Sequence, residues 1–131
     1  MRQRGGGLMY IITDKGGKNF INLTPHTITL LDEHGNEIFD LGGVNPPPRV
    51  EEVKTGVEEV EVNGNNAFKI YTSKNIGVNG LPAPQEDTYY IVSRIVAEYA
   101  DRDDLLVPDE FVRDSNGRII GARAFKKIES A

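Results

Sequence analysis

Arginine and aromatic side chains are the residues in this sequence whose types could do chemistry together. Guanidinium groups form paired hydrogen bonds with phosphates and carboxylates, and aromatic rings stack on flat heterocycles. Most of the arginines lie at the ends or edges of predicted elements, far apart along the chain. We expect folding, or the assembly of copies into a homo-oligomer, to bring them into one pocket for a small, anionic, nucleotide-like ligand. The predicted ligand-binding residues are Arg49, Phe68, Tyr89, Arg94, Arg113 and Arg123.

The pocket hypothesis has a simple alternative, because each arginine can instead pair with one of the chain's 20 acidic residues. Exposed ion pairs of that kind are common and contribute little to stability. The hypothesis therefore requires convergence, with Arg49, Arg113 and Arg123 on the phosphates and an aromatic ring stacked on the base. The segment 75–84, rich in Gly, Asn and Pro, is expected to be a loop that closes the pocket.

The two histidines have different surroundings in the sequence. His26 follows a proline, whereas His34 lies in a turn beside Gly35. A lone histidine has no catalytic mechanism without an oriented partner, so structural hydrogen bonding is the favoured role for His26. The alternative is a small hydrolase that uses His26 with Asp103 or Asp104. The acidic run 101–104 lacks the spacing of a calcium loop, and we predict no metal site there.

Several kinds of chemistry are excluded by what the sequence lacks. It has no cysteine, which excludes disulfides, cysteine-ligated zinc and a thiol nucleophile. It also lacks a glycine-rich phosphate loop, a dinucleotide fingerprint, a serine elbow and a His-Glu-x-x-His run. These absences favour a non-enzymatic binding protein with no cofactor.

The length of 131 residues and the charge pattern predict a single cytoplasmic domain. We expect residues 1–19 to be a flexible N-terminal extension and residues 20–128 to form the globular domain. The Gly-Gly-Gly-Leu-Met sequence suggests that Met9 is the biological start, or else that a genuine flexible tail precedes the domain. The net charge of -5 argues against DNA or RNA backbone binding, and the apolar runs are too short to cross a membrane.

The pattern of apolar residues predicts an α+β fold, predominantly an antiparallel β-sheet or small barrel with one short helix. Glycine and proline are frequent, and most apolar stretches are short, alternating or β-branched. The helix is predicted at 94–100 with Ser93 as its cap. Its flanking strands are joined by a parallel crossover or by an antiparallel return. The predicted strands cover 20–23, 27–31, 37–41, 50–62, 67–71, 89–92, 105–107, 110–113 and 118–125. Residues 9–12 are also apolar enough for a short strand. The valines of 50–62 have helical spacing as well, but strands are favoured there because valine is β-branched and Gly56 interrupts the pattern.

Short motifs along most of the chain resemble those of one protein family. They are Asn-Leu-Thr-Pro-His at 22–26, Gly-Leu-Pro-Ala-Pro at 80–84, Tyr-Ile-Val-Ser at 90–93, Arg-Asp-Asp-Leu at 102–105 and a Val-Arg-Asp to Ile-Ile-Gly hairpin at 112–121. The sequence is similar to a family of short, largely uncharacterised proteins of phages, prophages and bacteria. It departs from that family before Arg49, where three prolines stand without the usual small residue.

The resemblance implies a setting in a bacterial host cell and no established enzyme activity. Small accessory phage proteins include counter-defence factors that sequester nucleotide second messengers in pockets between subunits. By analogy, the resemblance implies sequestration of a small phosphorylated ligand in counter-defence. The alternative function is a structural or protein-partner module of a phage.

Overall fold

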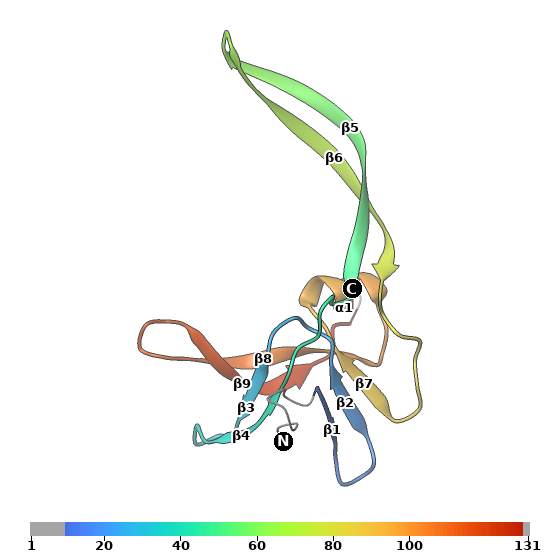
Figure 1. Cartoon of the computed structure of the whole chain (residues 1–131), viewed down its shortest axis with the longest axis vertical. Coiled ribbons are helices and arrows are strands. Elements are labelled where there is room, and N and C mark those ends of the chain that lie inside the picture. The colour runs from blue at the N-terminus through green and yellow to red at the C-terminus, as the bar shows by residue number, and fades with distance from the viewer. Residues whose placement is uncertain (1–9, 130–131) are drawn as a thin grey trace.

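The computed structural model describes residues 10–129 of the chain. The backbone of this part forms nine strands and one helix, in the order shown in Figure 1. The elements are β1 (Ile11–Thr13), β2 (Asn19–Asn22), β3 (Ile28–Leu31), β4 (Glu37–Leu41), β5 (Arg49–Asn63), β6 (Asn66–Asn79), β7 (Thr88–Ile91), α1 (Arg94–Ala100), β8 (Leu105–Arg113) and β9 (Ile119–Lys126).

Seven strands form one mixed, nearly closed, barrel-like sheet in the order β1-β2-β7-β8-β9-β3-β4, and β5 and β6 form a separate hairpin. The predicted fold class is confirmed. The pairs β2–β7, β7–β8 and β3–β9 are parallel, and the other pairs in the sheet are antiparallel. Strand β7, α1 and β8 make the parallel crossover, so the antiparallel return is wrong. The predicted hairpins β3–β4 and β8–β9 are both confirmed.

The core lies on both faces of the interior strand β7, because successive side chains of a strand point to opposite faces. Tyr90, with Val92 just beyond the strand, packs toward α1 on Val96 and Leu105. Ile91 points the other way, into a second cluster that is formed with β3, β4 and β8. Each fully buried side chain of this size contributes about 1.5–3 kcal/mol, so these two clusters hold the sheet and helix together.

The side chain of Asn22, the last residue of β2, holds the end of this strand against the end of β4. Asn22 is fully buried, and its Nδ2 donates to the carbonyl oxygens of His26, Leu41 and Gly42 at 2.9, 3.1 and 3.2 Å. Its Oδ1 accepts from the backbone amide and hydroxyl of Thr24 at 2.9 and 2.7 Å. One side chain thus joins the end of β2 to the end of β4, across the open side of the sheet.

Helix α1 has the predicted bounds and the predicted cap. The Ser93 side chain accepts from the Val96 amide at 3.4 Å, which satisfies one free donor of the first turn. The helix ends at Asp101, whose φ of 51° is left-handed and whose amide donates to the Ala97 carbonyl. This short helix therefore fixes the position of Arg94, its first residue.

Three predicted boundaries differ from the structure. The segment 11–13 lies within the expected flexible extension but forms the edge strand β1 and pairs with β2, in partial agreement with the short strand considered at 9–12. The question of a start at Met9 lies outside the described residues. Strand β6 continues to Asn79, so the first half of the predicted loop 75–84 is a strand. Strand β8 continues through Pro108, because proline lacks only a donor and accepts extended geometry.

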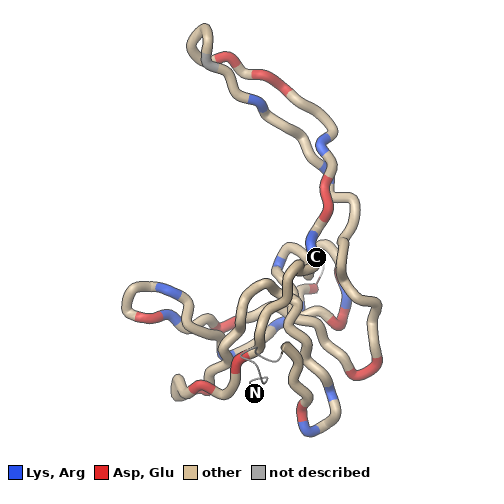
Figure 2. The backbone as a smooth tube through the Cα atoms, viewed as in Figure 1, with Lys and Arg blue, Asp and Glu red and all other residues tan. Residues whose placement is uncertain are grey.

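The β5–β6 hairpin, called the arm below, projects away from the rest of the molecule (Figure 1). Its base is anchored where Val50 and Val78 pack against the helix-side core and where the Tyr99 hydroxyl donates to the Asn75 carbonyl at 3.1 Å. Beyond the base, every described side chain of the two strands is exposed except the half-buried Val60. Figure 2 shows that acidic residues dominate β5 along this length.

Asp32 closes the β3–β4 turn and gives a pH-dependent prediction. The backbone amide of Asn36 donates to its carboxylate at 2.9 Å and is the largest cause that holds the Asp32 pKa below its ordinary value. The amide of His34 acts in the same direction. Because the folded pKa is the lower one, the ionised carboxylate stabilises the fold above the unfolded pKa of about 3.9. That stabilisation is lost as the pH falls through the folded pKa.

We therefore expect an NMR titration of the Asp32 carboxyl carbon to give a pKa below that of an unfolded aspartate. The Asp32→Asn variant should lose less stability than the native chain between pH 6 and pH 2. A carboxyl that titrates at or above its ordinary value would contradict this account of the turn.

Candidate functional site

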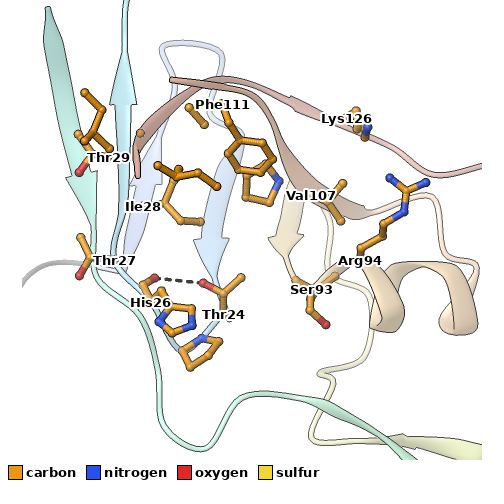
Figure 3. A pocket seen from close by; sticks show the side chains of 17 residues that line it. Thr24, His26, Thr27, Ile28, Thr29, Ser93, Arg94, Val107, Phe111 and Lys126 are labelled. Carbon is orange, nitrogen blue, oxygen red and sulfur yellow. Dashed lines mark hydrogen bonds between the residues drawn. The ribbon is translucent and has the colours of Figure 1, made fainter. Parts of the chain in front are cut away.

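A cleft of about 630 Å³ lies beside the sheet (Figure 3) and is called the large cleft below. Its walls come from the loop after β2, from β3, β8 and β9, and from the start of α1. The size and the mostly apolar wall are typical of small-molecule sites. The cleft is lined by Thr24, Pro25, His26, Thr27, Ile28, Thr29, Val92, Ser93, Arg94, Val107, Pro108, Phe111, Ile119, Ile120, Gly121, Ala122 and Lys126.

The polar groups of the cleft are unevenly distributed. Figure 3 shows Arg94 and Lys126 at the same end, Phe111 and Ile28 in the middle, and His26 toward the loop after β2. Both cations are held by exposed acids. Arg94 Nε lies 2.6 Å from Glu98 Oε1, and Lys126 Nζ lies 3.4 Å from Asp109 Oδ1. Exposed pairs of this kind contribute little, so an anionic ligand can take the place of either acid.

Close backbone packing shapes two walls of the cleft. A Cβ on Gly121 would lie 2.7 Å from the Thr29 carbonyl oxygen, so the glycine lets β9 approach β3. A Cβ on Gly43 would lie 2.6 and 2.7 Å from Pro25 C and His26 N. The carbonyl of His26 accepts from Asn22, which holds the loop wall in place.

The six predicted binding residues do not meet within one chain. Arg94 lines the cleft, whereas Arg49 begins the arm and Phe68 lies in the distal part of β6. Arg113 Nη1 donates to the Gly117 carbonyl at 2.8 Å, within the turn of the β8–β9 hairpin. Arg123 Nε donates to the Asp32 carbonyl at 3.2 Å. The predicted arginine cluster is therefore absent from the single chain.

Tyr89 lies at a second, smaller cavity of about 310 Å³. Its ring is stacked on Phe20 with 5.4 Å between centroids, and the ammonium groups of Lys18 and Lys127 lie 5.8 and 5.3 Å from it. The neighbouring Arg102 is held by two hydrogen bonds to Asp104, at 2.9 and 2.6 Å. These contacts join the walls of the second cavity to one another, and its arginine already has a carboxylate partner.

The geometry required by the hydrolase alternative is not present. His26 lines the large cleft, and Asp103 and Asp104 line the second cavity. Asp104 is paired with Arg102, and Asp103 lies 3.9 Å from Lys127. His26 takes part in structural hydrogen bonds through its backbone carbonyl, which accepts from Asn22 and Thr24, while its side chain is exposed.

Residues 10–129 show neither a metal site nor a membrane-spanning helix. These residues contain no group of three metal-ligating side chains. No helix in the same range is long and apolar enough to cross a membrane.

Comparison of the chain with protein-family models, with curated proteins and with solved structures finds no match in any of the three. The resemblance to short phage and bacterial proteins thus depends on the sequence motifs alone. Parts of three of these motifs, 22–26, 90–93 and 112–121, line the large cleft. The cleft is therefore the candidate functional site.

Proposed function

We propose that this protein is a non-enzymatic binding protein that sequesters a small phosphorylated, nucleotide-like ligand in the large cleft. The observation that carries the proposal is a cleft of about 630 Å³ whose mainly apolar walls end at two cationic side chains. Such a cleft fits a ligand with a flat apolar part and an anionic part. The proposed setting is the cytoplasm of a bacterial host, in counter-defence by a phage or prophage, on the strength of the motif resemblance.

The two parts of the ligand would contact different elements. The heterocycle would lie against the Phe111 ring and Ile120, two large apolar side chains of the cleft wall. The phosphate would take hydrogen bonds from Arg94 and Lys126, in place of their present contacts with Glu98 and Asp109. The Arg94 guanidinium supplies two parallel donors, a geometry that suits phosphate oxygens.

The polar groups of the cleft favour binding of a ligand over its chemical conversion, because they already have structural roles. The Ser93 hydroxyl caps α1, and the carbonyl of His26 is held by Asn22 and Thr24. The aspartates that could activate a histidine lie at the other cavity. This arrangement supports binding of the ligand without its chemical conversion.

Isothermal titration calorimetry tests the proposal with a panel of cyclic dinucleotides and cyclic ADP-ribose isomers, and with uncharged nucleosides as controls. At least one anionic member should bind, and should be recovered intact after the protein is denatured. Each charge-assisted hydrogen bond contributes about 1.5–3 kcal/mol, so Arg94→Gln and Lys126→Gln should each weaken binding by about 10-fold to 100-fold.

Arg49→Gln is the matched control, because Arg49 lies at the base of the arm and away from the cleft lining. Its affinity should equal that of the native chain. The proposal is wrong if no member of the panel binds, or if the Arg94 and Lys126 variants bind as tightly as the native protein.

A further inference from the structure

The arm exposes more apolar surface than a free hairpin can sustain. Strands of 15 and 14 residues form a two-stranded ribbon, and isolated two-stranded ribbons are only marginally stable in water. The apolar side chains that are at least two-fifths exposed on this ribbon are Val53, Val57, Val62, Phe68, Ile70, Tyr71 and Ile76. A ribbon with this surface requires a partner that covers it.

The strand register shows which side chains share a face of the arm. Val60 faces Phe68 and Glu58 faces Ile70, so these side chains share one face near the tip, called the tip face below. On the opposite face, Glu59 lies opposite Lys69, and the Lys54 ammonium lies 3.8 Å from the Tyr71 ring centroid. The opposite face also exposes Val57 and Tyr71, but the Lys54 ammonium covers the Tyr71 ring, whereas no charged group among the described residues covers Phe68 on the tip face.

The body of the protein exposes a matching surface on the β8–β9 hairpin. Phe111, Ile119 and Ile120 are 51, 51 and 50% exposed and form the outer wall of the cleft, called the rim below. Three exposed arginines lie on the same hairpin, at positions 113, 118 and 123. Glu110 is the exposed acid on the same hairpin, while Asp114 is used by the turn amides of Asn116 and Arg118.

We propose that the arm of one copy docks on the rim of a second copy, and that the two copies exchange arms reciprocally. Phe68 would be the anchor on Ile119 and Ile120. Glu58, which shares the tip face, would lie against the arginines of the β8–β9 hairpin. Charge complementarity identifies the partner, because one sequence supplies both an apolar, acidic projection and an apolar, basic receptor.

The length of the arm makes this exchange possible. Fourteen strand residues span roughly 45 Å, which is long enough to reach the body of another copy. Arm exchange would also bring Phe68 of one subunit beside the cleft of the other. The docked arm would share Phe111 and Ile120 with the proposed ligand, whereas Arg94 is not part of the rim, so an Arg94 variant separates ligand binding from assembly.

Light scattering after gel filtration of the full chain tests the exchange. The native chain should be a dimer. Phe68→Asp breaks the arm and Ile120→Asp breaks the rim, and each variant alone should be monomeric, with association weakened at least about 30-fold. Val57→Asp, on the opposite face of the arm, should leave the dimer intact. Both test residues are about half exposed, so circular dichroism should show native folding in each variant.

Mixing the two monomeric variants gives the sharpest result. The intact arm of the Ile120→Asp chain can dock on the intact rim of the Phe68→Asp chain, so the mixture should form a heterodimer. Pairing of arm with arm predicts instead that Ile120→Asp stays dimeric, and that mixing restores nothing. A monomeric native chain would also overturn the inference. Arg94→Gln should keep the dimer, so failure of ligand binding and failure of assembly are separable.

Discussion

Replacing Asn22 with alanine is expected to lower the free energy of unfolding by about 3 kcal/mol or more, the largest effect that we predict. The substitution removes the Nδ2 donor from the carbonyl oxygens of His26, Leu41 and Gly42. It also removes the acceptor of the Thr24 amide. Each buried polar group left without a partner costs about 1–3 kcal/mol, and the side chain that joins β2 to β4 is lost as well.

Urea unfolding measures this effect, with Asn36→Ala as the control. Asn36 is an asparagine just before a strand, but its side chain is exposed and makes one hydrogen bond of 3.3 Å to Asp32. The control should change stability by less than about 1 kcal/mol. Asn22→Asp should be at least as damaging as Asn22→Ala, because it turns a carboxylate toward three carbonyl oxygens. An Asn22→Ala chain of native stability would show that the Asn22 side chain does not hold β2 against β4.

Replacing Gly43 with alanine is expected to be the next most damaging change, at about 2–4 kcal/mol. The new Cβ would meet Pro25 C at 2.6 Å, His26 N at 2.7 Å and Pro25 O at 2.8 Å. These are backbone atoms, which a rotamer change cannot move. The loop that forms one wall of the cleft must therefore shift, and ligand affinity should fall together with stability.

Gly77→Ala is the matched control for Gly43, because nothing lies within 4 Å of the position that its Cβ would occupy. Gly77 is in strand β6, and alanine there should be neutral or stabilising by up to about 1 kcal/mol. Thermal unfolding of the two variants side by side checks the contrast. Equal melting temperatures would show that the loop yields to the added methyl group.

The local elements could be predicted from the sequence because their signals are local. Ser93 before an apolar helical face fixes α1, and the turn residues at 32–36 and 114–117 fix two hairpins. The full arm could not be predicted, because Asn75 and Gly77 are typical of a turn although the cross-strand pairing continues past them. The parallel pairs of the sheet join segments that are distant along the chain, so no local pattern indicates them.

The candidate site could be predicted only in part for the same reason. Arg94 was expected from its position at the start of a helix and does line the cleft. Phe111, Ile120 and Lys126 were missed, since their alternation indicates a hairpin without showing which face meets the loop after β2. The role of segment 22–26 in the cleft wall could not be predicted either, because it depends on the burial of Asn22 and Thr24, which no local pattern indicates.

The most direct test of the proposed function is an amide NMR titration of the native chain with the tightest ligand of the calorimetric panel. We predict that the shifts gather at Thr24, Ser93, Arg94, Ile120 and Ala122, which line the large cleft. The β5 strand of the arm and the second cavity around Tyr89 should change little. Shifts centred on Tyr89 and Arg102, with the large cleft unchanged, would contradict the assignment of the site.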